Sequence, residues 1–274
     1  MLTYFDDVHS YDIPKSPEVF HDSGGVFGLF AKAMNSFPAP MPHEIIPDFH
    51  NTFKRYEALE KAIQENPVGR LDNVGKEVEF IRKHRATFRL ISDALENGEI
   101  PLRIAHNDCN LNNVLFDDAT DRPVAVIDLD TVMPSTILYD FGDSMRIGTN
   151  TAKDDEKDLS KVCCDLKLYE SYARGWLEAC GDTLTEKELE LLPYASIIIS
   201  FEDGIRFLMD YLNGDTYYYI YYLGQNLDRA RTQLKLAEDM LQKLPEIKKI
   251  LPRILKELGI KIPSSMLETE RESA

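Results

Sequence analysis

One short segment with strand character interrupts a chain that is otherwise patterned as amphipathic helices. Its apolar pieces, "RIA", "NVLFD" and "PVAVIDLD", are rich in β-branched residues, and the polar turn "DDATDR" separates the last two. On both sides of it apolar residues recur at helical spacing, over 16–36, 51–66, about 72–97, 158–180, 186–212, 222–243 and 246–258. We therefore predict an α+β fold that is predominantly α, with a small β-hairpin insert at its centre.

Three glycines in the first helical pattern resemble part of a nucleotide-binding loop. Gly24, Gly25 and Gly28 form the pattern GGxxG, but no strand precedes them and the residues around them keep helical spacing. We therefore predict that these glycines lie inside a helix and bind no nucleotide.

The charge of the chain argues against polyanionic partners. The 274 residues carry a formal net charge of −16, which repels nucleic acid and anionic lipid at long range. Any phosphate group handled by this chain is expected to arrive with a divalent cation. The N-terminal residues lack the pattern of a secretory signal, and no apolar run approaches the length of a membrane span. We predict a soluble, cytoplasmic protein with no nucleic-acid or membrane partner, and we leave its oligomeric state open.

Three oxygen-bearing side chains stand at the spacing that phosphoryl transfer requires. In "HNDCNLNN", Asp108 is followed five residues later by Asn113, and Asp128 follows the apolar run of "VIDLD". A kinase catalytic loop and its metal-binding aspartate have this spacing, with Asp108 as proton acceptor and Asn113 and Asp128 as Mg²⁺ ligands. An ordinary Asx-rich turn would explain Asp108 and Asn113 alone, but not the matching position of Asp128.

Other polar residues of this region are expected to support the site rather than to react. His106 occupies the histidine position of the kinase loop, and we predict a packed, hydrogen-bonded scaffold residue. Asp140, in "YDFGDS", lies too far along the chain for the metal motif, so we expect it in a loop entering the next helix, where it holds the loop of Asp108. Cys109 has no evident cationic neighbour to lower its pKa, and the four cysteines show no CxxC spacing, so unreactive, reduced thiols are expected.

Taken together, these motifs resemble a known family. "HNDCNLNNVLFD", "AVIDLDTVMPSTILYDFGDSMR" and the later "FEDGIRFLMDYLNGDTYYYIYYLGQNLDRARTQLKLAEDM" are similar to the aminoglycoside phosphotransferase and choline kinase-like family of small-molecule kinases. Within it they look most like the N-acetylhexosamine 1-kinase branch, from about residue 4 to about 243. The resemblance implies a protein kinase-like large (C-terminal) lobe, with ATP as co-substrate, Mg²⁺ as cofactor and a small-molecule sugar as substrate. By the same resemblance Asp108 is the base, and Asn113 and Asp128 hold the metal.

The resemblance also marks substrate-contacting positions. Asp130, on the same side of an extended strand as Asp128, would support the metal or the hydroxyl-bearing substrate. Arg206 and Tyr217 match positions that resemble the sugar-contacting residues of hexosamine kinases. Two alternatives stay open: Arg206 could pair with Glu202 one helical turn earlier, and Tyr217, in an aromatic run, could serve the core or an interface.

The chain departs from the family pattern before Asp108. It shows neither a Gly-rich loop nor a strand lysine there, although both hold the phosphates in a complete kinase of this type. We expect residues 1–14 to be a remnant of the inter-lobe linker, 15–260 to form the kinase-like C-terminal lobe, and 261–274 to be a frayed tail. Turnover by this chain alone is expected to be very low.

Other functions compete with that of a sugar kinase. "VIDLDTV" also satisfies the DxDx[TV] pattern of haloacid dehalogenase-type phosphatases, but the helical pattern after Pro134 does not supply their alternating strands. A lobe without its ATP lid could be a catalytically silent sugar-binding or regulatory module. The substrate could also be another alcohol, such as an aminoglycoside or choline. We expect transfer of the ATP γ-phosphoryl group to an amino sugar, such as an N-acetylhexosamine at its anomeric hydroxyl.

Overall fold

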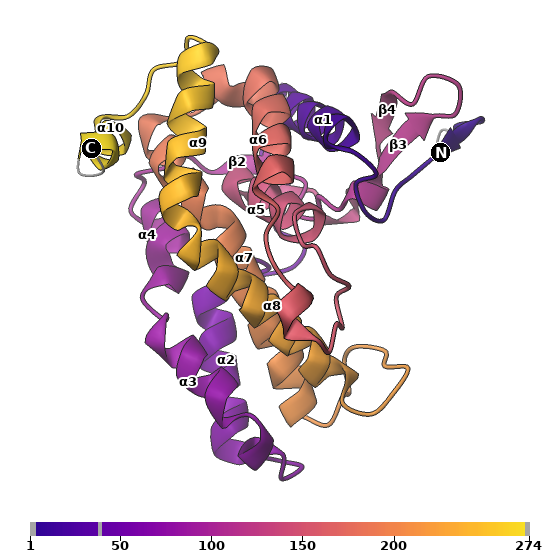
Figure 1. Ribbon diagram of the computed structural model, residues 1–274, viewed down its shortest axis with the longest axis vertical. Coiled ribbons are helices and arrows are strands. Elements are labelled where there is room, and N and C mark those ends of the chain that lie inside the picture. Colours follow the sequence, from indigo (N-terminus) through magenta and orange to yellow (C-terminus); the bar gives the residue numbers. More distant parts are fainter. Residues whose placement is uncertain (1–3, 38–39, 272–274) are drawn as a thin grey trace.

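The computed structural model describes residues 4–37 and 40–271, in which helices predominate (Figure 1). The helices are α1 (Pro17–Asn35), α2 (Thr52–Glu65), α3 (Gly75–Lys83), α4 (Leu90–Glu96), α5 (Ile137–Gly148), α6 (Leu166–Cys180), α7 (Glu186–Leu212), α8 (Gln225–Gln242), α9 (Leu244–Glu257) and α10 (Ser264–Arg271). The strands are β1 (Val8–His9), β2 (Arg103–Ala105), β3 (Val114–Asp117), β4 (Pro123–Val126) and β5 (Met133–Ser135). The predicted class, predominantly α with a small central β insert, is confirmed.

The strands form two small antiparallel sheets. β3 and β4 pair as the predicted hairpin, and β1 adds to the free edge of β3, with His9 opposite Phe116. β2, the "RIA" segment, pairs instead with β5, with Ile104 opposite Pro134. The sequence pattern did not indicate β5, because a proline cannot donate to a strand ladder and is tolerated only at a sheet edge. The polar loop (residues 106–113) therefore runs from one sheet to the other.

Two of the predicted helices have different limits in the structure. The segment 72–97 is not one helix, because the 3₁₀ turn Thr87–Arg89 separates α3 from α4. The helix predicted over 158–180 begins only at Leu166, where the Asp165 carboxylate accepts from N–H groups of the first turn. Capping by a side-chain carboxylate therefore sets the start of α6.

The helix α5 is an addition to the sequence-based assignment. The Thr136 side chain caps it by accepting from the N–H of Leu138. Asp140 lies in its first turn, so the prediction that Asp140 stands in a loop before the next helix is wrong. Asp140 and Asp143 are three residues apart, on one face of the helix, and both are buried. The sequence of α5 therefore lacks the separation into a buried apolar face and an exposed polar face that marks an amphipathic helix.

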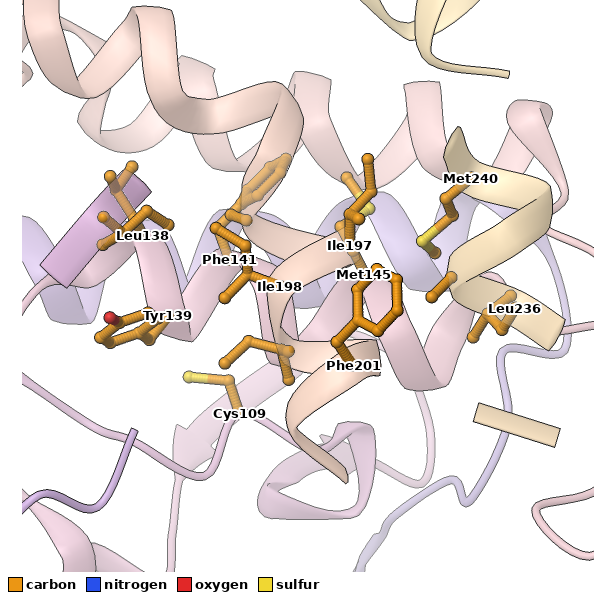
Figure 2. Close-up of a cluster of buried hydrophobic side chains, with 14 of the residues drawn as sticks. Cys109, Leu138, Tyr139, Phe141, Met145, Ile197, Ile198, Phe201, Leu236 and Met240 are labelled. Carbon is orange, nitrogen blue, oxygen red and sulfur yellow. The ribbon is translucent and has the colours of Figure 1, made fainter. Parts of the chain in front are cut away.

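A buried apolar cluster holds α5 in place. Figure 2 shows side chains of α5, α7 and α8 in this cluster, among them Leu138, Phe141, Met145, Ile197, Ile198, Phe201, Leu236 and Met240. The helices approach closely at Gly142, where a Cβ would stand 2.6 Å from the carbonyl oxygen of Ala195. Truncating a fully buried phenylalanine such as Phe141 costs about 3–5 kcal/mol, so the cluster makes α5 a firm support for the polar loop.

The glycines of α1 serve helix packing. A Cβ on Gly24 would stand 2.5 Å from the carbonyl oxygen of Tyr172, and one on Gly28 would stand 2.8 Å from that of Trp176. From the other side, a Cβ on Gly175 of α6 would overlap the carbonyl oxygen of His21. The prediction that these glycines of the GGxxG pattern lie inside a helix is confirmed, and their small size lets α1 and α6 approach backbone to backbone.

The two ends of the described chain pack on the body of the fold. Within the segment expected as a linker, β1 pairs with β3. Within the segment expected to be frayed, α10 packs on α9 and buries Met266, because "IPSSM" supplies apolar residues that contact the helix before it. Across the residues that the structure describes, no helix is both long and apolar enough to span a bilayer.

Candidate active site

The polar loop brings Asp108 and Asn113 together, as predicted. The Asn113 amide donates from Nδ2 to the main-chain oxygen of Asp108 at 2.9 Å and to its carboxylate Oδ2 at 3.1 Å. The Asn110 amide donates to the other carboxylate oxygen, Oδ1. A 3₁₀ turn over Leu111–Asn113 folds the loop back and makes these contacts possible. The half-buried Asp108 carboxylate is therefore held on both of its oxygens.

Asp140 and His106 hold the back of the polar loop. The Asp140 carboxylate accepts from the N–H of His106 at 2.9 Å and from the N–H of Asn107 at 2.7 Å. The His106 ring lies 3.0 Å from the main-chain oxygen of Ile127 through Nε2, and packs edge-on against Phe27 and Phe30 of α1. Because a carbonyl only accepts, Nε2 of His106 is the donor. Both side chains are buried: Asp140 holds the main chain of the loop, and His106 joins the loop to the main chain at Ile127.

Asn107 gives the polar loop its sharp change of direction. Its backbone is left-handed, with φ 64°, which asparagine tolerates better than most residues. Its side chain donates to the main-chain oxygens of Ala105, at 3.2 Å, and Thr131, at 3.0 Å. Side-chain hydrogen bonds therefore stabilise the residue that precedes Asp108 in this uncommon conformation.

Asp128 lies beside Asn113, across the β3–β4 pair. The N–H of Ile127 donates to the main-chain oxygen of Asn113 at 2.9 Å, which sets Asp128 one residue beyond that point. Asp128 is exposed and left-handed, with φ 58° and ψ 61°, at the start of the 3₁₀ turn Leu129–Thr131. Asp130 lies in that turn and is also exposed. Its expected place on an extended strand is therefore wrong, because the strand ends at Val126.

The surroundings of Asp108 raise its pKa. Burial is the largest cause, the negative charge of Asp143 is the next, and the charge of Asp128 adds to them. The hydrogen bond from Asn113 acts in the opposite direction. Burial and the charge of Asp143 are therefore the main causes of the raised pKa, and Asp128 contributes less.

A chain of charges that was not predicted leads from Asp143 to Arg206. Arg146 contacts Asp143 at 2.8 Å and Asp203 at 3.1 Å, and Asp203 lies 3.3 Å from Arg206. Asp143 follows Asp140 by three residues on one helix, and this spacing is the only sequence signal that could have placed it near the polar loop. Arg146 and Asp203 come from different helices, so no local spacing predicts that they meet.

Arg206 does not pair with Glu202, so that alternative is wrong. Glu202 instead lies 3.0 Å from His50 and accepts from the Thr52 hydroxyl at 2.8 Å. The guanidinium of Arg206 lies within reach of two aromatic rings, 5.9 Å from the centroid of Phe49 and 5.7 Å from that of Tyr218.

Tyr217 stands at the protein surface. Its side chain is 76% exposed, so the alternative of a core residue is wrong. Its N–H donates to Asp210 at 2.9 Å, and its ring meets Tyr218 edge-on at 4.8 Å. Tyr218, which the sequence did not single out, is the half-buried ring that packs on Phe207 and lies near Arg206.

Cys109 is buried beneath the polar loop, and burial raises the pKa of its thiol well above the usual range. Both features favour the predicted unreactive thiol, which stays a prediction.

Across the residues that the structure describes, no group of three or more histidine, cysteine, aspartate or glutamate side chains forms a metal site. A cation here would instead use a carboxylate and an amide oxygen. Both hydrogen bonds that the Asn113 side chain makes run from Nδ2, which leaves Oδ1 to face a cation next to Asp128.

Comparison with known proteins places this architecture. Residues 8–187 match the family described as "Phosphotransferase enzyme family" (APH). An aminoglycoside phosphotransferase from Alicyclobacillus acidocaldarius superposes with a TM-score of 0.58 at 15% identity, over 89% of this chain and 70% of that one. A choline kinase from Cryptosporidium parvum superposes with a TM-score of 0.56 at 15% identity, over 91% and 72%. A choline/ethanolamine kinase family protein from Mesorhizobium loti gives 0.54 at 13%, over 92% and 71%.

The structural likenesses show a protein kinase-like fold, as predicted. At these identities they show the fold alone, and the family rests on the sequence match. That match extends from β1 through the polar loop and the hairpin to the start of α7, which is more than half of the chain. This protein therefore belongs to the phosphotransferase enzyme family.

Proposed function

We propose that this protein is a small-molecule kinase that transfers the γ-phosphoryl group of ATP to a hydroxyl of an amino sugar, such as the anomeric hydroxyl of an N-acetylhexosamine. The observation that carries the proposal is the Asp108 carboxylate. It is half-buried, it is held by two amide side chains, and its loop is hydrogen-bonded at Asn113 to the residue before Asp128. Family membership supports the reaction class.

In the proposed reaction Asp108 orients the substrate hydroxyl and accepts its proton. The hydroxyl oxygen bonds to the γ-phosphorus, the bond from that phosphorus to the β–γ bridging oxygen breaks, and ADP leaves. The proton passes to the Asp108 carboxylate and then to solvent. Because burial and the charge of Asp143 raise the pKa of Asp108, its carboxylate is a better proton acceptor than a fully exposed one.

The oxygen atoms of Asn113 and Asp128 would hold Mg²⁺ on the triphosphate. When bound, the ion supplies charge neutralisation of the phosphate oxygens. His106 and Asp140 keep the polar loop in place and do not touch the reacting atoms in this proposal. Exposed Asp130, next to Asp128, would support either the metal or the sugar.

The amino-sugar substrate is proposed from Arg206 and Tyr217. Arg206 offers directed N–H donors beside two aromatic rings, and exposed Tyr217 offers a ring face and a hydroxyl. Sugars are bound by a few directed hydrogen bonds together with contacts to aromatic rings. Ion pairs link Arg206 through Asp203 and Arg146 to Asp143, whose charge acts on Asp108, and in this proposal the substrate contacts both Arg206 and Asp108.

A coupled ADP-release assay tests the proposal on N-acetylhexosamines, aminoglycosides and choline. We expect the protein to phosphorylate an N-acetylhexosamine. If it were inactive on every sugar, the amino-sugar assignment would fail. Sugar binding by calorimetry without any turnover would identify a silent binding module.

The substitution Asp108→Asn tests the role of the base. The substitution should abolish turnover and leave the circular dichroism spectrum and the melting temperature unchanged. Asp117→Asn, which makes the same change of charge in β3, is the matched control and should retain activity. Undiminished turnover in Asp108→Asn would remove Asp108 from the base role.

A further inference from the structure

His50, in the segment between α1 and α2, bridges two parts of the molecule that border the proposed site. Its Nδ1 lies 3.0 Å from the Glu202 carboxylate of α7, and its Nε2 lies 3.1 Å from the main-chain oxygen of Asn107 in the polar loop. The side chains of His50 and Glu202 are only 7% and 1% exposed. The second oxygen of Glu202 accepts from the hydroxyl of Thr52. The bridge is therefore buried and fully engaged at both of its ends.

Both groups that face the nitrogens of His50 are hydrogen-bond acceptors. A neutral imidazole donates from one nitrogen only, so the imidazolium alone satisfies both contacts. Burial opposes the charge, but the carboxylate of Glu202 outweighs it, with a smaller contribution from Asp143, and the pKa of His50 is raised. The geometry and the electrostatics thus indicate the same protonation state.

Among the described residues, no other group hydrogen-bonds to the His50 ring, and the buried carboxylate of Asp140 on α5 also interacts with it electrostatically. The ring lies 5.3 Å from that of Tyr139 on α5 and 4.6 Å from that of Phe49. A cavity of about 290 Å³ beside it is lined by the carboxylates of Glu44, Asp48 and Glu96, of which Asp48 pairs with Lys54 at 2.7 Å. The net negative lining favours the imidazolium, and the cavity gives a route for proton exchange.

His50 ties the polar loop to the helix that carries Arg206. Asn107 directly precedes Asp108, and its left-handed backbone sets the direction in which the chain enters Asp108. Glu202 directly precedes Asp203, which pairs with Arg206. A change at His50 would therefore shift the base relative to the proposed sugar-binding arginine, without touching either one.

We propose that the His50 imidazolium is a positioning residue that fixes Asp108 relative to the Arg206 side of the substrate site. The inference rests on the proposed kinase function, in which the hydroxyl lies against Asp108 while the rest of the substrate contacts Arg206. A displacement of about 1 Å at a reacting group can cost on the order of 100-fold in rate. Loss of the bridge should therefore lower kcat more than it raises KM.

The bridge also predicts a pH dependence. The two acceptors that face the ring favour its doubly protonated form, and the pKa of His50 is raised. As the pH rises through that pKa, the ring loses a proton. One ring nitrogen then becomes an acceptor that faces another acceptor, so that hydrogen bond is lost and kcat should fall. In Glu202→Gln the charge that raises the pKa is gone, so the fall in kcat should move to lower pH. A histidine that merely fills space would show no such movement.

The experiment measures kcat and KM across pH for wild type, His50→Gln, Glu202→Gln and the control His84→Gln, on the alcohol that the wild type phosphorylates. His84 packs against Phe80 and Phe201, outside the bridge, and its substitution should leave the pH profile unchanged. We expect His50→Gln to lose on the order of 10- to 100-fold in kcat, with KM within about twofold, and to lose the alkaline fall. If His50→Gln does not fold, the nearly isosteric Glu202→Gln carries the test.

Side-chain ¹⁵N NMR of the wild type reports the protonation state of His50 without any need for turnover. Imidazolium resonances at pH 7 and a shifted profile in Glu202→Gln would support the inference. A neutral ring at pH 7, or a folded His50→Gln with the wild-type profile, would overturn the positioning role while leaving the kinase function intact. If the wild type phosphorylated no alcohol, the proposed function itself would fall, and the positioning role with it.

Discussion

Asp143 and Arg146 form a 2.8 Å ion pair on α5, with side chains only 8% and 11% exposed. Arg146 also contacts Asp203 of α7, so one buried guanidinium lies against two carboxylates. The charge of Asp143 reaches Asp108, where it is the second cause of a raised pKa after burial. Both the basicity of Asp108 and the junction of α5 with α7 therefore depend on this pair.

Removing the charge of Asp143 should move the acid limb of the profile of kcat against pH. In the proposed mechanism Asp108 must be ionised to accept a proton, so kcat falls as the pH drops through the raised pKa of Asp108. Asp143→Asn removes one of the charges that raise this pKa, so the acid limb should shift to lower pH. The measurement is kcat as a function of pH for the wild type and for Asp143→Asn. A limb that moved to higher pH, or did not move, would contradict the place of Asp143 in tuning the base.

Removing Arg146 should destabilise the fold. Arg146→Met leaves Asp143 and Asp203 buried without their shared cation, and breaking a buried pair in this way costs about 3–5 kcal/mol. Arg122→Met is the matched control, since Arg122 pairs with Asp22 at the surface and such pairs contribute about 0–1 kcal/mol. Urea denaturation of both variants measures the difference. Equal losses in the free energy of unfolding would show that the ion pairs of Arg146 stabilise the fold no more than a surface pair does.

The parts of the site that the sequence predicted are close together along the chain. Asp108 and Asn113 share one loop, and Asp128 follows shortly after β4, the strand paired with β3, so motif spacing and the hairpin bring these segments together. The helices α1 and α7 were predicted well, and each begins at a clear side-chain cap, Ser16 in α1 and Thr185 in α7. α5 was not predicted because it buries Asp140, Asp143 and Ser144 toward the polar loop, and these polar residues interrupt its apolar period.

The parts of the site that the sequence did not predict depend on contacts between residues that are far apart in the chain. His50 meets a carbonyl 57 residues away and a carboxylate 152 residues away. Arg146 likewise meets Asp203 on a different helix. These contacts leave no periodic or local signal, because the partners meet only when the segment before α2, the polar loop, α5 and α7 pack together. Such buried polar pairs are required by the cost of leaving a charge unpaired in the interior, but their partners become visible only in the folded chain.

Asp128→Asn should raise the Mg²⁺ concentration needed for half-maximal activity. The substitution keeps an oxygen ligand but removes its negative charge, and a loss of about 1.4 kcal/mol in binding corresponds to roughly a tenfold weaker site. Asp117→Asn, on the same hairpin and with the same change of charge, should leave the Mg²⁺ response unchanged. Direct Mn²⁺ titration followed by electron paramagnetic resonance tests the site without turnover. Wild-type Mn²⁺ affinity in Asp128→Asn would exclude Asp128 as a ligand.

The close approach of α1 and α6 should make Gly175 intolerant of substitution and leave Gly25 tolerant. In Gly175→Ala the new methyl group would overlap the carbonyl oxygen of His21, which is backbone and cannot swing aside, so a loss of about 1–3 kcal/mol or more is expected. In Gly25→Ala the nearest atom, the carbonyl oxygen of Gly175, lies 3.8 Å away in ordinary contact, so a gain of about 0.5–1 kcal/mol from helix propensity is expected.

Thermal melts of Gly175→Ala and Gly25→Ala compare the two sides of one interface. Because Phe27 and Phe30 of α1 pack against His106, a displaced α1 should also loosen the polar loop, so Gly175→Ala should lose kcat beyond what its unfolded fraction explains. Equal stability of the two variants would mean that α1 and α6 can separate at little cost. In that case the packing of His106 against α1 would not help to hold Asp108.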